Sequence, residues 1–151
     1  MIDKNGVSMV TGDIVRIENA YFKSDCGYWF ITYSPGDPAW SSHSFHGLQK
    51  IGKHGKICKS NKSGVWPLMA FTNNKQKNEE SNNFNESHAT IEVIKGVDAS
   101  DIIAYFMEES EKNKRLAEKK SSYWQASGII PMKYKEIADF YTGVVKRLCQ
   151  T

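Results

Sequence analysis

Residues 12–34 contain two strand-like runs around a short polar segment, and this pattern constrains the fold more than any other. The first run places Val15 and Ile17 on one side of a period-2 pattern, which is typical of a half-buried strand. The second run, residues 28–33, is almost continuously apolar or aromatic, as expected of a strand that is buried on both faces. The polar segment ends at Gly27, which can adopt a positive φ. These residues therefore predict an antiparallel β-hairpin.

Further short strands are predicted after this hairpin. Apolar residues on either side of Lys53–Gly55 indicate a second hairpin with a tight turn. Pro67 restricts the apolar run 65–71 to an edge strand, a bulge or an irregular segment. Residues 73–89 are rich in Asn, Lys and Glu, and we interpret them as a solvated helix, with a long loop as the alternative. Residues 90–94 alternate and predict the strand that closes the sheet.

Two amphipathic helices are predicted near the end of the chain. Apolar residues recur at helical spacing over residues 99–107 and again over residues 134–148. Asp98 is placed to cap the first of these helices, because its carboxylate can accept from free amides at a helix start. Pro131 suits the first turn of the second helix.

This order of elements predicts an α+β fold. We expect a small, strongly bent antiparallel sheet or an SH3-like barrel, with a helical insert and two C-terminal helices. The expected division is a β-rich, barrel-like domain at residues 1–97 and a helical extension at residues 98–151 that packs on it. With 40% hydrophobic and 25% charged residues, the composition is typical of a globular protein.

The cysteines and the hydropathy predict a cytoplasmic protein. Cys26, Cys58 and Cys149 are an odd number of widely spaced cysteines without a CxxC pair, which favours reduced thiols over a disulfide framework. No apolar run approaches the roughly 18 residues that a membrane-spanning helix needs, so no membrane association is expected.

The positive charge of the chain is concentrated in one segment. The net charge is only +3, but residues 47–64 contain five lysines and no acidic residue. Residues 1–46 have a net charge of −2 and residues 65–151 a net charge of zero. The distribution of charge therefore indicates more about partners than the total does.

The lysines of this segment stand three residues apart and could form an anion-binding rim. The candidate binding residues are these five lysines, a turn histidine and a loop tryptophan: Lys50, Lys53, His54, Lys56, Lys59, Lys62 and Trp40. Aromatic residues near the rim could stack on exposed bases, with Phe45 and Trp66 as further candidates. The alternative is a solvated strand edge, because this spacing alternates faces in a strand and lysine protects edges from aggregation.

Catalytic and metal sites are weakly indicated. Cys26, His43, His46 and Cys58 have ligand types that suit zinc, but they lack the paired spacing of a zinc knuckle, so we expect no metal. No G-x-S-x-G elbow, P-loop or G-x-G-x-x-G is present, and we expect no catalytic residues and no cofactor. We therefore interpret the chain as non-enzymatic.

One stretch of the chain carries a resemblance. The segment GDIVRIENAYFKSDCGYWFITYSPGDPAW, followed by VWPLMAF and HATIEVI, resembles small uncharacterised proteins and modules of phages and mobile elements of gut Gram-positive bacteria. The resemblance covers about residues 12–94 and brings no known active site. It implies an accessory protein, and such proteins often act against host defence, including CRISPR effectors.

These observations lead to three hypotheses. The first is a binding protein that engages nucleic acid or a host ribonucleoprotein or defence complex, in the manner of an anti-CRISPR inhibitor that touches a guide or target strand. The second is an enzyme or sequestering protein for a small anionic ligand such as a nucleotide. The third is a homo-oligomer that forms through the C-terminal helices.

Overall fold

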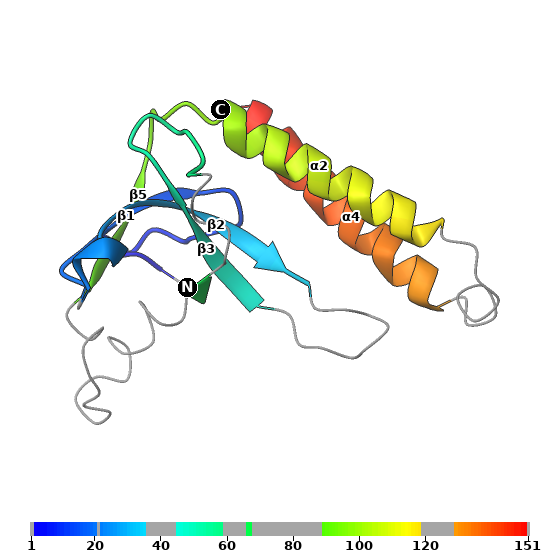
Figure 1. Ribbon diagram of the computed structural model, residues 1–151, viewed down its shortest axis with the longest axis horizontal. Helices are drawn as coiled ribbons and strands as arrows, with labels where there is room; N and C mark the ends of the chain where they lie inside the picture. Colours follow the sequence, from blue (N-terminus) through cyan, green and yellow to red (C-terminus); the bar gives the residue numbers. More distant parts are fainter. Residues whose placement is uncertain are drawn as a thin grey trace, which may run out of the picture. The chain divides into compact units, whose positions relative to one another are not determined.

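The structure is a computed structural model. The described residues are 2–20, 22–35, 45–58, 66–67, 89–118 and 129–150. The elements, in chain order, are β1 (Ile14–Glu18), β2 (Gly27–Ser34), β3 (Phe45–Ile51), β4 (Trp66–Pro67), β5 (Thr90–Ile94), α2 (Ser100–Ala117) and α4 (Ile129–Cys149) (Figure 1). The predicted α+β class is confirmed. The chain divides into two compact units. The first, Met1–Ser34 and Phe45–Asp98, holds the sheet, and the second, Pro35–Ser44 and Ala99–Thr151, holds the two helices.

The strands form one antiparallel sheet in the order β4-β3-β2-β1-β5. The predicted first hairpin is confirmed, with Val15 opposite Trp29 in the pairing of β1 with β2. Strand β5 pairs with the other side of β1. Strand β4, which contains Pro67, is an edge strand, one of the three alternatives that this proline allowed, because proline cannot donate to a neighbouring strand. Since β4 and β5 lie at opposite edges, the sheet is open over the described residues and the expected barrel closure is not seen there.

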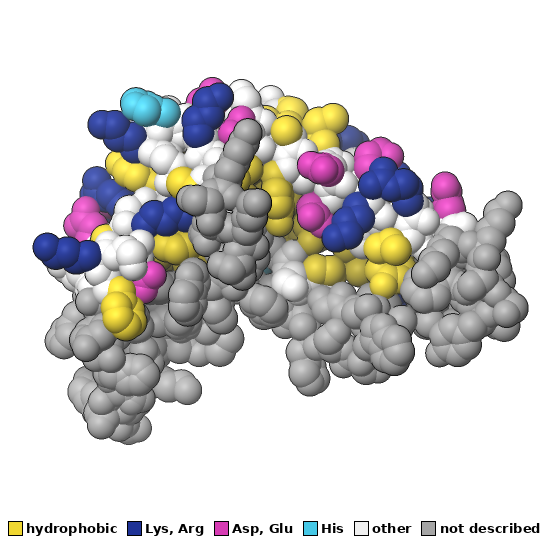
Figure 2. Space-filling view, in the orientation of Figure 1, with side chains coloured by type: hydrophobic (Ala, Val, Ile, Leu, Met, Phe, Trp, Pro, Cys, Tyr) yellow, Lys and Arg dark blue, Asp and Glu magenta, His cyan; other side chains and the backbone are white. Residues whose placement is uncertain are grey.

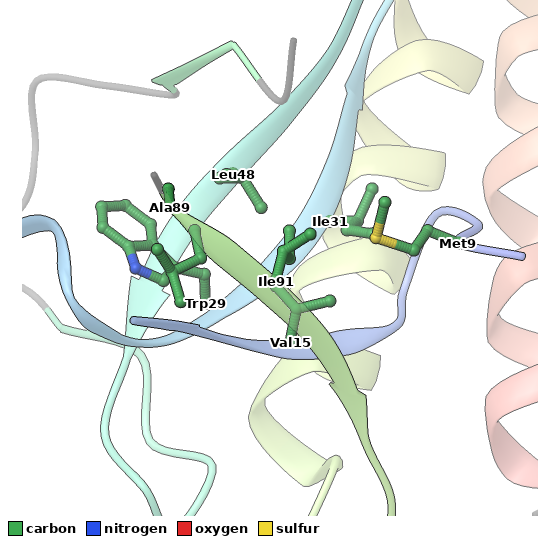
Figure 3. Close-up of a cluster of buried hydrophobic side chains, with 8 residues drawn as sticks. Met9, Val15, Trp29, Ile31, Leu48, Ala89 and Ile91 are labelled. Carbon is green, nitrogen blue, oxygen red and sulfur yellow. The ribbon is translucent and has the colours of Figure 1, made fainter. Parts of the chain in front are cut away.

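A hydrophobic core covers one face of the sheet (Figure 3). Its buried members come from the strands and from the segments before β1 and β5: Met9, Val15, Ile17, Trp29, Ile31, Leu48, Ala89 and Ile91. In the middle of β2, Phe30 and Thr32 on the opposite face are buried as well, and Phe30 is fully inaccessible. Strand β2 is thus buried on both faces, which explains its continuous apolar sequence.

The two helices lie side by side and antiparallel (Figure 1). Ile102 and Phe106 of α2 are buried, as the helical spacing predicted, and the Phe106 and Tyr141 rings stack with centroids 5.7 Å apart. Ser110 adds a polar contact, donating to the Ala138 carbonyl at 3.2 Å and sharing a 2.8 Å hydrogen bond with Thr142. Neither described helix is long and apolar enough to cross a membrane.

Two predictions about α2 are wrong, and the prediction of a helical insert falls outside the described residues. The helical spacing predicts that Met107 is buried on α2, but Met107 is 54% exposed. The N-cap position of α2 is Ala99 rather than Asp98, and no side-chain hydrogen bond caps this helix. The expected helical insert at residues 73–89 lies outside the described residues apart from Ala89.

The outer edge of β5 is covered by the N-terminal segment through Asp3. The Asp3 carboxylate is buried, at 5% relative exposure, and accepts hydrogen bonds from the backbone N–H groups of Asn5 and Val7 at 2.8 Å. Its second oxygen accepts from the Val93 N–H at 2.9 Å. The next residue, Lys4, donates its backbone N–H to the Ile91 carbonyl at 2.9 Å. These contacts satisfy edge groups of β5 that would otherwise be open for pairing with another chain.

We expect Asp3→Asn to destabilise the fold, by about 1–3 kcal/mol, because an amide nitrogen would face a backbone donor in place of a carboxylate oxygen. Burial would raise the pKa of Asp3, but the three backbone N–H donors together lower it below its usual value. A carboxyl with a lowered pKa stabilises the fold above its unfolded pKa of about 4. This contribution is lost as the pH falls through the pKa of the folded state.

Urea unfolding of the wild type and of Asp3→Asn at pH 3 to 7 measures both effects. The difference in unfolding free energy should be largest near neutral pH and should shrink at the acidic end. The matched control is Asp139→Asn on the exposed face of α4, which should stay within about 0.5 kcal/mol of the wild type. Equal stability of the wild type and Asp3→Asn at neutral pH would contradict this role of the carboxylate.

Candidate nucleic-acid interface

The tight turn that follows β3 is confirmed and has a fixed backbone. The Gly52 N–H donates to the Lys56 carbonyl at 2.8 Å, and the Gly55 N–H donates to the Gly52 carbonyl at 2.9 Å. Gly55 has a φ of +89°, which other residues rarely adopt. A Cβ at this position would also collide with the Asp98 carbonyl oxygen. The turn therefore packs its backbone closely against the chain that follows β5.

Three candidate residues are exposed on this turn. Lys53, His54 and Lys56 extend into solvent, and Figure 2 shows Lys or Arg side chains next to a histidine over the loop that follows β3. The turn lies between Ile51 and Ile57, which form an isolated antiparallel bridge. A short β-like ribbon thus carries the exposed basic groups. We call Lys53, His54 and Lys56 the basic turn.

Lys50 has a different environment from the basic turn. It lies in β3 opposite Trp29, on the face of the sheet that carries the core. Its ammonium donates to the backbone carbonyls of Ser24 at 2.6 Å and of Cys26 at 2.7 Å. The Nζ atom also lies 4.8 Å from the centroid of the Trp29 ring, within the range of a cation–π interaction. Lys50 thus ties β3 to the connection between β1 and β2.

The connection between β1 and β2 is built to receive this ammonium. Its 3-10 turn, Lys23–Asp25, precedes Gly27, whose φ of +127° is confirmed as positive. A Cβ at Gly27 would lie 3.3 Å from the Lys50 Nζ, so glycine leaves room for the lysine. The Trp29 indole N–H donates to the Asp25 carbonyl at 2.9 Å. Burial raises the pKa of the Asp25 carboxyl, and the nearby charge of Lys50 opposes this shift.

The regular spacing of the lysines therefore does not produce one continuous rim in the described residues. Lys50 is held against backbone carbonyls on the core face, whereas Lys53 and Lys56 are exposed on the turn. Lys59, Lys62 and Trp40 lie outside the described residues. The structure brings together Lys53, His54 and Lys56 from the predicted set.

The imagined metal site is not assembled in the part of the chain that the structure describes. No group of three or more His, Cys, Asp or Glu side chains there is close enough to hold a metal ion. Cys26, Cys58 and Cys149 are free thiols. His46 lies in β3, where its ring contacts Tyr33 with centroids 5.4 Å apart, and His43 lies outside the described residues.

Phe22 is an exposed aromatic residue that the sequence pattern did not single out. Phe22, just before the 3-10 turn, is 59% exposed. It directly precedes the polar loop residues Lys23 and Ser24. The signal that could have identified it is an aromatic side chain beside a loop that begins with a lysine.

We expect Lys50→Met to lower the free energy of unfolding by about 1–3 kcal/mol, because methionine keeps the aliphatic stem and loses both hydrogen bonds of the charged group. Lys53→Met is the matched control on the exposed turn and should change this free energy by no more than about 0.5 kcal/mol. Guanidinium unfolding monitored by tryptophan fluorescence measures both variants. Equal destabilisation by the two substitutions would show that the contacts of Lys50 do not stabilise the fold.

Comparison of the chain with models of known protein families, with characterised proteins and with solved structures gave no match. The site is therefore interpreted from its own residues and geometry.

Proposed function

We propose that this chain is a non-enzymatic binding protein that engages nucleic acid, or a host complex that handles nucleic acid, through the basic turn. The observation that carries the proposal is the exposure of Lys53, His54 and Lys56 together on a turn whose backbone is fixed. This turn lies in a segment, residues 47–64, that has five lysines and no acidic residue. Such a local concentration of positive charge suits phosphate groups.

The rigidity of the turn favours binding with few contacts. Hydrogen bonds between Gly52, Gly55 and Lys56 close the turn, and Gly55 is packed against the Asp98 carbonyl. The backbone therefore needs no further ordering when a ligand binds, and the cost is limited to the lysine side chains. Lys95 is also exposed. It lies between β5 and Asp98 in the sequence and adds a cation to the segment that Gly55 contacts.

The proposed setting is a phage or mobile element, with a role against host defence. The resemblance of residues 12–94 to modules of such elements supports this setting. A protein that imitates nucleic acid needs concentrated acidic groups, whereas this chain concentrates basic ones. Contact with a guide or target strand of a defence complex, such as a CRISPR effector, is therefore the mode that we propose.

We expect the double variant Lys53→Ala/Lys56→Ala to bind oligonucleotides more weakly and with less dependence on salt. Each lost phosphate contact should make the slope of log K against log salt shallower by about 0.9 for duplex DNA or about 0.7 for a single strand. Fluorescence anisotropy titrations at several salt concentrations measure both quantities. The single variants separate the contribution of each lysine.

The matched control is Lys112→Ala/Lys114→Ala, which removes two exposed lysines from α2 and should leave the salt slope unchanged. A basic-turn variant with the affinity and salt slope of the wild type would rule out the basic turn as the binding surface. Competition by a mononucleotide as strong as that by an oligonucleotide would point instead to a small anionic ligand.

A further inference from the structure

The loop between β1 and β2 presents an aromatic ring and a cation at its tip. Phe22 is 59% exposed, and its neighbours Lys23 and Ser24 are exposed as well. The acidic residue of this loop, Asp25, is turned inward and has a relative exposure of only 9%. The side chains offered to solvent at the tip are therefore aromatic, cationic and hydroxylic.

The backbone that carries Phe22 is fixed from within. The Phe22 carbonyl accepts from the Asp25 N–H at 2.9 Å, and the Lys23 carbonyl accepts from the Cys26 N–H at 3.1 Å. The carbonyls of Ser24 and Cys26 accept from the Lys50 ammonium. An apolar side chain that remains exposed on such a constrained backbone is typical of a residue that contacts a partner.

This tip and the basic turn lie at the same end of the sheet. Ile51, the last residue of β3, pairs with Tyr28, the second residue of β2, so the loop before β2 and the turn after β3 leave the sheet at the same end. Lys50, one residue before Ile51, directly contacts the loop. The fold thus places an exposed aromatic residue and exposed lysines from two separate segments at one end of β2 and β3.

We propose that Phe22 stacks on an unpaired base of a single-stranded nucleic acid whose phosphates contact Lys23 and the basic turn. This inference rests on the proposed function and names the form of nucleic acid that the site takes. Aromatic rings next to a basic surface are the combination by which proteins bind single strands without reading their sequence. Every base has a π-face, so the site needs no particular base.

The placement of Phe22 favours a single strand over a duplex or a protein partner. Bases inside a duplex are stacked on each other and offer no free face to a ring at a loop tip. A protein that used Phe22 as an anchor would have to cover it with an apolar pocket, and the exposed lysines at this end of the sheet would then need acidic partners. The lysines at this end of the sheet match a phosphate backbone directly.

The test compares oligothymidylate with an abasic oligonucleotide of the same length, about 12 nucleotides, which keeps the phosphates and lacks the bases. The wild type should bind oligothymidylate more tightly than the abasic strand. Phe22→Ala should weaken binding to oligothymidylate by about 5- to 150-fold, which is the typical loss on removing one stacking partner. It should leave the affinity for the abasic strand and the salt slope unchanged. Oligouridylate should respond in the same way, because stacking does not involve the 2′-hydroxyl.

Substitutions of graded chemistry separate stacking from apolar contact and from misfolding. Phe22→Trp should retain the preference for oligothymidylate, whereas Phe22→Leu, which keeps an apolar side chain without a ring, should lose most of it. Met132→Ala on α4 is the matched control, since Met132 is exposed to a similar extent at 57%, and it should bind like the wild type. Urea unfolding midpoints equal to that of the wild type show that the Phe22 variants are folded.

The outcomes distinguish this inference from the proposed function. Wild-type affinity of Phe22→Ala for oligothymidylate, together with weakened binding by Lys53→Ala/Lys56→Ala, would overturn the stacking role and leave the basic turn as the binding surface. A wild-type protein that binds neither strand would overturn both. Equal affinities of the wild type for the two strands would overturn the inference alone.

Discussion

The end of the sheet where β2 begins and β3 ends depends on one interaction, in which the Lys50 ammonium donates to two backbone carbonyls. Charge-assisted hydrogen bonds to Ser24 and Cys26, at 2.6 and 2.7 Å, are shorter and stronger than bonds between neutral groups. The same ammonium lies over the Trp29 ring, whose indole N–H holds the Asp25 carbonyl. One lysine of β3 therefore fixes the loop before β2, and the exposed positions of that loop follow from it.

The regularly spaced lysines of residues 47–64 do not all have the same environment in the structure. Side chains alternate between faces along a strand, and Lys50 lies on the face of Trp29, where its ammonium contacts two carbonyls and the Trp29 ring. The chain leaves the strand after Ile51, so Lys53 and Lys56 follow the geometry of the turn and are exposed. Lysines that are neighbours in the sequence thus have different roles: Lys50 stabilises the structure, whereas Lys53 and Lys56 are exposed on the surface.

Local pattern explains the parts of this fold that the sequence could predict. Each kind of element buries its residues at a characteristic spacing, and the sequence shows that spacing directly. Examples are the alternation around Val15, the continuous apolar run around Phe30 and the helical spacing around Tyr141. Gly27 and Pro67 act through their own backbone chemistry, so the positive φ of Gly27 could be predicted and an edge strand was among the alternatives for Pro67.

The contacts that the sequence could not predict join residues far apart in the chain. Asp3 covers the edge of β5 by accepting from Val93, ninety residues later, and no local pattern marks that partner. Lys50 resembled its neighbouring lysines in spacing and type, and only the pairing of β2 with β3 shows that it faces Trp29. The exposure of Phe22 likewise depends on how its loop is fixed rather than on its place in an apolar pattern.

The same non-local contacts lower the entropy cost that a small binding surface would pay on binding a ligand. Each side chain that becomes immobile on binding costs about 0.5–1.5 kcal/mol, and loops that must also order their backbone cost more. Here Lys50 fixes the backbone of one loop, and the packing of Gly55 on the Asp98 carbonyl fixes the other. Asp3 meanwhile accepts from the Val93 N–H on the outer edge of β5, where a partner could otherwise add a strand. The sheet therefore favours recognition by side chains at the end of β2 and β3, where the backbone is already in place, over recognition by pairing at the edge of β5.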